Sequence, residues 1–162
     1  MNYDYFSRLE EGSLIRPEDQ SEQAFMETVL SAVFSEKTSL MEGRVNDKLA
    51  PQFHSCSAEN RSLSVSFGVQ EWMLNPNGTL HGGMLSTAVD MVMSVLSRYL
   101  SKKRSMVTAQ LSMNFLRTIR CDDTFTVTLV ADHVGRRSVI VHAYVAVSSS
   151  EKTAATATAV LM

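Results

Sequence analysis

The sequence is poor in the residues that would cross-link a chain or hold a metal ion. It contains only two cysteines, Cys56 and Cys121, which lie far apart and outside any Cys-x-x-Cys spacing. A disulfide framework or a structural zinc site needs more cysteines or histidines at fixed spacing. His54 lies two residues before Cys56, but two ligands in an irregular stretch do not make a tetrahedral site. The sequence therefore predicts two free thiols and no metal.

The chain also lacks a strong excess of charge of either sign. Its formal net charge is -2, with 15 basic and 17 acidic side chains. This balance gives no long-range attraction to nucleic acid or to an anionic membrane. The first residues, MNYDYFSRLEEGS, lack the basic start and the apolar run of a secretory signal. We therefore expect a cytoplasmic protein with neither a nucleic-acid partner nor a membrane partner.

The first fifty residues carry a helical pattern of apolar side chains. After a candidate cap at Ser21, six of them recur at helical spacing, namely Phe25, Met26, Val29, Leu30, Val33 and Phe34. A weaker pattern predicts a second short helix, ended by Pro51, from Leu40, Met41, Val45 and Leu49. We therefore expect residues 1–50 to form an N-terminal helical extension and residues 51–162 to form the main domain.

A second and longer helix is predicted from Met84 to Leu100, where nearly every side of the helix is apolar. The segment approaches the length of a membrane span. However, Asp90 lies in its middle, and a carboxylate at the centre of a bilayer costs about 3 kcal/mol. A helix surrounded by protein is the better interpretation.

Strands are predicted wherever apolar residues alternate with polar ones. The first begins at Arg61 and continues through Leu63, Val65, Phe67 and Val69. Four more segments alternate in the same way, at residues 106–116, 124–131, 138–147 and 153–161. Short turns and no crossover helices separate these four, which favours antiparallel pairing. A long apolar helix and about five strands bury each other when a curved antiparallel sheet wraps around the helix. This α+β arrangement is the hotdog fold.

The segment before the long helix, NPNGTLHGG (residues 75–83), offers a site for a carbonyl oxygen. Glycines at a helix entry expose backbone N–H groups that have no partner within the helix, and the helix dipole adds to their attraction. One such donor typically contributes about 3 to 4 kcal/mol to an oxyanion. We predict the Gly82 N–H as this donor, with Gly83 beside it as a substrate contact. A turn without a ligand, next to a structural His81, is the alternative.

Asp90 is the least ordinary residue of the long helix, because its neighbours in the sequence are apolar. A buried carboxylate is costly unless it has a partner or a task. The sequence predicts that Asp90 attacks a carbonyl carbon or deprotonates a water. The alternative is a structural carboxylate, hydrogen-bonded to a neighbouring helix or to a second copy of the chain. Thr87, Asp90, Ser94 and Ser97 recur at helical spacing and form a polar stripe that could line a groove.

The spacing of these residues also predicts an oligomer. Nine residues separate His81 from Asp90, which is about 13 Å along a helix axis. One chain therefore cannot easily bring both to one carbonyl group. Two such helices running antiparallel across a two-fold axis would bring Asp90 of one chain to His81 and Gly82 of the other. We expect at least a homodimer.

On the predicted strand from Met106, strict alternation divides the residues between two faces. Apolar side chains occupy one face, and Thr108, Gln110, Ser112 and Asn114 occupy the other. Thr108 is a candidate for holding a water or orienting the carboxylate, and Gln110 for contacting substrate. Exposure to solvent is an equally good reason for a polar face.

The run NPNGTLHGG, Asp90 downstream of it, and VTAQLSMNFLRTI (residues 107–119) together resemble a known family. This is the phenylacetate-pathway, or PaaI-like, branch of the hotdog thioesterases, which are related to mammalian acyl-CoA thioesterases. The resemblance covers roughly residues 60–162. It implies hydrolysis of an acyl-CoA substrate to free acid and CoA, without a metal or redox cofactor, by a dimer of dimers.

The resemblance also implies roles for individual residues. Asp90 would be the nucleophile or the general base, and the Gly82 amide would polarise the thioester carbonyl. Asn75 and His81 would orient the site, and Thr108 occupies the position of a family serine or threonine near the reaction centre.

The phosphate groups of CoA call for cationic side chains at the mouth of the site. Arg117, Arg136 and Arg137 are the candidates at strand ends, with Arg120 nearby and Lys102, Lys103 and Arg104 after the long helix.

Two other functions remain open from the sequence. One is a hotdog dehydratase or hydratase, and the other is a module that binds acyl-CoA without turnover.

Overall fold

The computed structural model describes residues 7–9, 13–35, 43–102, 106–150 and 152–162. Its elements, in chain order, are α2 (Glu22–Ser35), α3 (Val45–Lys48), β1 (Gln52–Ser57), β2 (Ser62–Gly68), the 3-10 helix η1 (Glu71–Met73), α4 (Gly82–Ser101), β3 (Thr108–Phe115), β4 (Thr124–Val134), β5 (Val139–Val147) and β6 (Thr153–Leu161). Four residues named in the predictions, Leu40, Met41, Lys103 and Arg104, lie outside the described residues.

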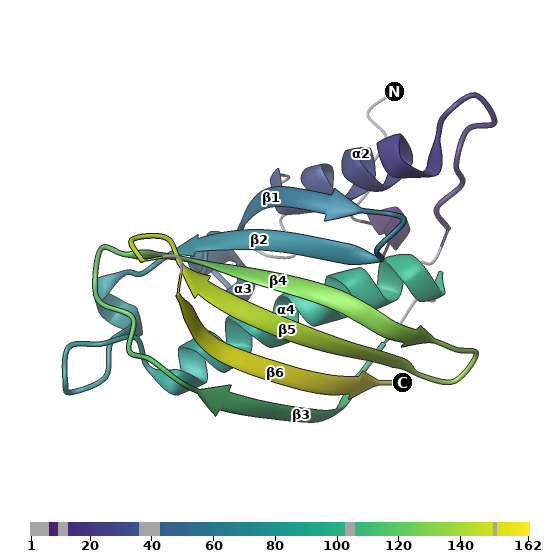
Figure 1. Cartoon of the computed structure of the whole chain (residues 1–162). Helices are drawn as coiled ribbons and strands as arrows, with labels where there is room; N and C mark the ends of the chain where they lie inside the picture. Colours follow the sequence, from purple (N-terminus) through teal and green to yellow (C-terminus); the bar gives the residue numbers. More distant parts are fainter. Residues whose placement is uncertain (1–6, 10–12, 36–42, 103–105, 151) are drawn as a thin grey trace.

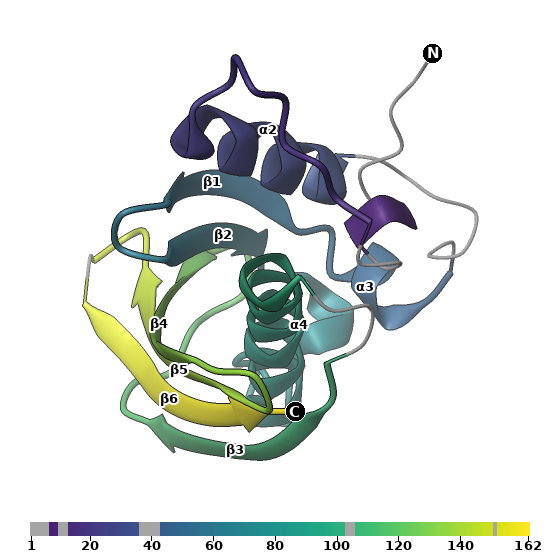
Figure 2. The ribbon, with the colours of Figure 1, turned by 90° about the vertical axis from the view of Figure 1, so that its right-hand side faces the viewer.

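The strands form one antiparallel sheet of six, in the order β1-β2-β4-β5-β6-β3. The sheet crosses in front of α4 in Figure 1, and Figure 2 shows it curling around the helix seen along its axis. The predicted hotdog fold is therefore confirmed. Within the described part of the chain, no helix is both long and apolar enough to cross a membrane.

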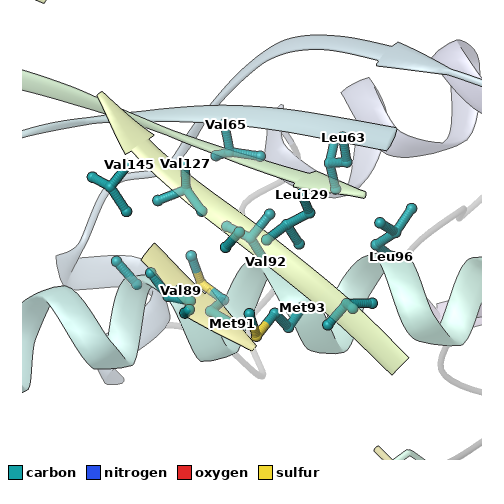
Figure 3. Packing of buried hydrophobic residues seen from close by; sticks show 14 of the residues in the cluster. Leu63, Val65, Val89, Met91, Val92, Met93, Leu96, Val127, Leu129 and Val145 are labelled. Atoms are coloured by element: carbon teal, nitrogen blue, oxygen red, sulfur yellow. The ribbon is translucent and has the colours of Figure 1, made fainter. Parts of the chain in front are cut away.

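The core lies between α4 and the concave face of the sheet. Val89, Val92 and Leu96 of α4 are fully buried and face β2, β4 and β5, where Leu63 and Val127 are fully buried too. Figure 3 shows these side chains meeting between helix and sheet. Because the sheet covers most of α4, the helix is apolar on several sides, as its sequence predicted.

Strand β1 was not predicted, and the interpretation of residues 54–56 as irregular was wrong. β1 pairs with β2, but its register shifts between Phe53 and Ser55. This shift marks a bulge, which adds one unpaired residue and breaks the alternation of faces. The pattern of period two is therefore absent from the sequence, although the strand is present. Both cysteines are free, as predicted, and burial raises the pKa of the Cys56 thiol.

Helix α2 begins as predicted, because the Ser21 hydroxyl accepts a hydrogen bond from the Ala24 N–H over 3.2 Å. The helix lies along β1, where the Gln23 side chain bonds the Cys56 carbonyl and the Ala58 N–H. Its Phe25 ring also lies 6.4 Å from the ring of Tyr99 in α4. Burial, and then the Glu22 carboxylate, raise the pKa of Tyr99 to about 12.

The buried side chains of α2 belong to the same hydrophobic core as those of the sheet. The predicted division into an extension at residues 1–50 and a domain at 51–162 remains a prediction.

We predict that Leu30→Ala lowers the free energy of unfolding by about 2 to 5 kcal/mol, because Leu30 is fully buried and the cavity would not collapse completely. Chemical denaturation monitored by circular dichroism measures this. Glu27→Ala, on the exposed side of the same helix, is the control and should change stability by less than about 0.5 kcal/mol. Equal effects of the two substitutions would show that α2 does not share the core.

Candidate functional site

The loop before α4 is shaped by Asn75. Its side-chain oxygen accepts hydrogen bonds from the N–H groups of Asn77 (2.9 Å) and Thr79 (3.3 Å), and its amide nitrogen donates to the Thr79 hydroxyl. These contacts close an Asx turn, and Gly78 completes it with a positive φ of 72°. The Asn75 side chain therefore holds the loop that leads into the helix.

His81 is the N-cap of α4. Its Nδ1 accepts a hydrogen bond from the Gly83 N–H over 2.8 Å. The backbone N–H of His81 donates to the Met73 carbonyl. Because Nδ1 is the acceptor, a neutral ring carries its proton on Nε2. A Cβ on Gly83 would lie 3.0 Å from Nδ1, so a glycine at position 83 leaves room for the imidazole. The Gly83 amide is thus already occupied by His81.

The Gly82 amide, in contrast, has a free N–H group among the described residues. Met84 and Leu85 donate to the His81 carbonyl, but the Gly82 N–H has no hydrogen-bond acceptor among the described residues. As the first residue of a helix of 20 residues, it lies at the positive end of the helix dipole. The structure therefore offers one backbone donor for an external oxygen at the position that the sequence predicted.

A pocket of about 310 Å³ opens beside this donor. It is lined by residues of the Asn75 loop, the start of α4 and the end of β3, namely Asn75, Thr79, Leu80, Gly82, Leu85, Phe115, Leu116, Arg117, Thr118 and Ile119. Its volume lies at the small end of the range for ligand sites. A larger hollow of about 530 Å³ lies between α2, α3 and β1, but it holds no residue with a predicted role. We therefore take the smaller pocket as the candidate site.

The carboxylate of Asp90 lies half-buried two turns further along α4. Thr108 Oγ1 donates a hydrogen bond of 2.6 Å to Asp90 Oδ1. The other oxygen, Oδ2, has no hydrogen bond to the part of the chain that the structure describes. Asp90 is thus oriented through one oxygen while the other is available for chemistry.

The contact depends on a bulge that the sequence pattern does not show. The register of β3 against β6 shifts between Thr108 and Gln110, so that Thr108 and Leu111 both face α4. Strict alternation had placed Thr108 opposite Leu111, and that assignment of faces was wrong. Its predicted role beside the carboxylate fits the observed hydrogen bond.

The polar stripe on α4 is shorter than predicted. Thr87 donates to the Gly83 carbonyl, which satisfies its hydroxyl within the helix, and Ser97 is fully buried. Thr87, Asp90 and Ser94 are half-buried, whereas Ser97 is not accessible to line a groove. The stripe ends early because the rest of the chain covers α4 at Ser97, near the C-terminal end of the helix.

The remaining candidates lie in three places. Arg117 lines the pocket beside Gly82, and its guanidinium donates to the Thr153 carbonyl. Arg136 and Arg137 lie in the hairpin between β4 and β5, near the end of the sheet where β3 begins. Gln110 is exposed on the outer face of the sheet, away from α4. Of these four candidates, Arg117 alone therefore lies near the Gly82 N–H of the same chain.

The sequence analysis missed the apolar wall of the pocket. Phe115 was placed on the apolar face of its strand, but nothing in the pattern connected it with Gly82, 33 positions earlier. Among the described residues, no group of three or more His, Cys, Asp or Glu side chains is arranged to hold a metal ion.

Comparison with known sequences gives a match to the site region. Residues 77–153 match the model of the Thioesterase superfamily. A candidate esterase of Saccharolobus solfataricus is 36% identical over 77 residues, which are 48% of this chain and 51% of that protein. The chain covers 51% and 57% of two curated relatives, or little more than half of their length.

Comparison with solved structures gives matches over two thirds of the chain or more. A Streptococcus mutans protein solved with acetyl-CoA bound is 28% identical, with a TM-score of 0.60 over 68% of this chain and 87% of that one. A phenylacetic acid degradation-related protein of Ralstonia eutropha is 24% identical, with a TM-score of 0.67 over 98% of both chains. Both matches agree with the fold predicted from the sequence.

We predict that His81→Ala lowers the stability of the protein by about 1 kcal/mol, because it removes the acceptor for the Gly83 N–H. His81→Asn should keep most of the stability, since asparagine is a good N-cap. Thermal unfolding followed by calorimetry measures both. If Ala and Asn at position 81 are equally destabilising, the capping role is wrong.

Proposed function

Because residues 77–153 carry the thioesterase-superfamily segment, we propose that this protein is an acyl-CoA thioesterase. The observation that supports the proposal most directly is the Gly82 N–H, which has no acceptor among the described residues and lies beside a pocket at the positive end of α4. A thioester carbonyl oxygen suits this donor, because negative charge develops on that oxygen during hydrolysis.

In the proposed reaction, the Gly82 N–H donates to the carbonyl oxygen and makes the carbonyl carbon more electrophilic. Asp90 acts as the nucleophile on this carbon or as the general base for a water. The carbon–sulfur bond then breaks, and CoA leaves as a thiolate that takes up a proton. In the first route the acyl group is then joined to Asp90 as an anhydride, which water hydrolyses to the free acid and the Asp90 carboxylate; in the second, the activated water attacks the carbonyl carbon directly. Thr108 orients Asp90 through Oδ1 and leaves Oδ2 for the reaction.

We propose further that each site is shared by two chains. Gly82 and Asp90 lie eight residues apart on one straight helix, about 12 Å along its axis. β3 is the last strand of the sheet, so one of its edges is free. Two large apolar side chains are exposed along it, Phe115 in the strand (54%) and Val107 just before it (67%), beside the exposed polar side chains of Gln110, Ser112 and Asn114. The unpaired backbone N–H and C=O groups of an edge strand can pair with a strand of another chain. Antiparallel pairing of β3 with its copy would bring the partner's Asp90 towards Gly82.

The same pairing accounts for the cationic candidates. Arg117 lies at the pocket with Gly82, while Arg136 and Arg137 lie at the opposite end of the sheet. In an antiparallel dimer, the partner's hairpin would approach the pocket, so that both groups could contact the phosphates of CoA. Acetyl-CoA in the S. mutans structure supports a CoA thioester as ligand. A dimer of two such dimers is the assembly we propose.

We propose that this activity is cytoplasmic. The proposed steps use a backbone donor, a carboxylate and water, so they require neither a metal nor a redox cofactor.

We predict that Asp90→Asn lowers kcat by about 10² to 10⁴-fold, because it removes the charge that attacks or activates water. The asparagine oxygen can still accept the hydrogen bond from Thr108, so the fold and the binding of a non-hydrolysable thioether analogue should change little. Release of free CoA and calorimetric binding of the analogue measure the two effects.

The matched control is Asp132→Asn, because Asp132 is a hydrogen-bonded carboxylate too, paired with His142 on the sheet. It should keep normal turnover. Normal turnover in Asp90→Asn would refute the mechanism. Binding of acyl-CoA by the wild type without any turnover would instead favour a non-catalytic binding module.

A subunit-mixing experiment tests the shared site. Gly82→Pro removes the N–H at the first helical position, where proline is well tolerated, and His81 already has a compatible φ of -65° and ψ of 131°. This variant alone should lose about 10² to 10³-fold in kcat. Refolded together in equal amounts, inactive Gly82→Pro and Asp90→Asn chains should recover about a quarter of the wild-type sites, because half the dimers are mixed and each has one intact site. No recovery would place each site within one chain.

A further inference from the structure

The ring of Phe115 lies directly against the predicted carbonyl donor. A Cβ placed on Gly82 would lie 3.4 Å from both Cε1 and Cζ of this ring. The distance is ordinary van der Waals contact, so the ring borders the Gly82 backbone with the space of about one methyl group between them. Phe115 is nevertheless 54% exposed. One part of the ring therefore covers the start of α4, and the rest borders the open pocket.

This position is fixed by the sheet and not by a flexible loop. Phe115 pairs with Ala155, whose small buried side chain leaves room for the ring on the helix side of the sheet. Immediately after the ring, the N–H groups of Leu116 and Arg117 both donate to the Ala154 carbonyl, at 2.8 and 3.0 Å. The Arg117 guanidinium also donates to the Thr153 carbonyl. The end of β3 is thus tied to the start of β6.

We propose that Phe115 is a positioning residue for hydrolysis, and that its ring forms the apolar wall that holds the thioester carbonyl against the Gly82 N–H. The inference rests on the proposed thioesterase activity. Without the wall, water competes for the amide and the carbonyl can turn away from it. With the wall, the hydrogen bond lies in a less polar environment, where it is stronger and where the oxyanion gains most from it.

A purely structural role for Phe115 predicts a different outcome. Because half of the ring is exposed, its truncation removes little buried area and should cost little stability. A loss of turnover in a variant of nearly normal stability would therefore come from the site. The matched control is Tyr144→Ala, since Tyr144 is an aromatic residue of β5 with 51% exposure on the outer face of the sheet.

We expect Phe115→Ala to lower kcat by about 10 to 100-fold, as a small misplacement of the reacting group does, with a smaller change in KM. Phe115→Leu restores apolar bulk and should recover most of kcat. Tyr144→Ala should remain within about twofold of the wild type. An unchanged kcat in Phe115→Ala, or an equal loss in Tyr144→Ala, would overturn the proposal.

A double-mutant cycle with Gly82→Pro tests whether Phe115 acts through the amide. If it does, Phe115→Ala should lower kcat little further in a protein that already carries Gly82→Pro. If the two residues act independently, the fold-losses in kcat of the two single variants should multiply in the double variant. Multiplied losses would overturn the inference.

A measurement without turnover separates this inference from the proposed function. Phe115→Ala should speed hydrogen exchange of the Gly82 amide several-fold in ¹⁵N-resolved spectra, because water reaches the N–H more freely, while Phe115→Leu should not. An unchanged exchange rate would refute the wall. If the wild type hydrolyses no thioester, the proposed function fails, and the exchange rate still decides whether Phe115 shields the amide.

Discussion

The burial of α4 inside the curled sheet is the constraint on which the rest of the structure depends. The helix meets β2, β3, β4, β5 and β6, and its fully buried side chains fix its rotation as well as its axis. Once that rod is fixed, the free amide at its first residue and the carboxylate two turns later have fixed positions. A rigid element places functional groups more accurately than a loop does. The apolar packing in Figure 3 therefore determines the geometry of the candidate site.

Most of the fold could be predicted, because apolar side chains report which face of an element is buried. The pattern of α4 and the alternation in β2, β4, β5 and β6 led to the hotdog fold, and solved structures share this fold. Residues 77–153 also match the model of the Thioesterase superfamily. The two errors in the sheet have one cause. Bulges at Phe53/Ser55 and at Thr108/Gln110 insert a residue and reverse the faces beyond it. A bulge is set by pairing with a neighbouring strand, which a single segment of sequence does not contain.

The sequence led to a candidate site at the start of α4, but the contacts there could not be assigned from sequence. Two adjacent glycines looked equivalent, yet the Gly83 amide is capped by His81 and only the Gly82 amide is left. Likewise, Asn75 uses its side chain to close the loop. Phe115 was beyond prediction as a site residue, because its contact with Gly82 joins the end of a strand to the start of a helix.

Pairing of β3 with its copy, as proposed, would make the activity of the protein depend on its own abundance. If each site needs a partner's carboxylate, the number of sites follows the equilibrium between separate and paired chains, by mass action. Specific activity then falls on dilution below the dissociation constant of the dimer, although every chain stays folded. Substrate that binds across the two chains would draw them together and oppose this loss. The cell could thus tune turnover through the amount of protein that it makes, without modifying any residue of the site.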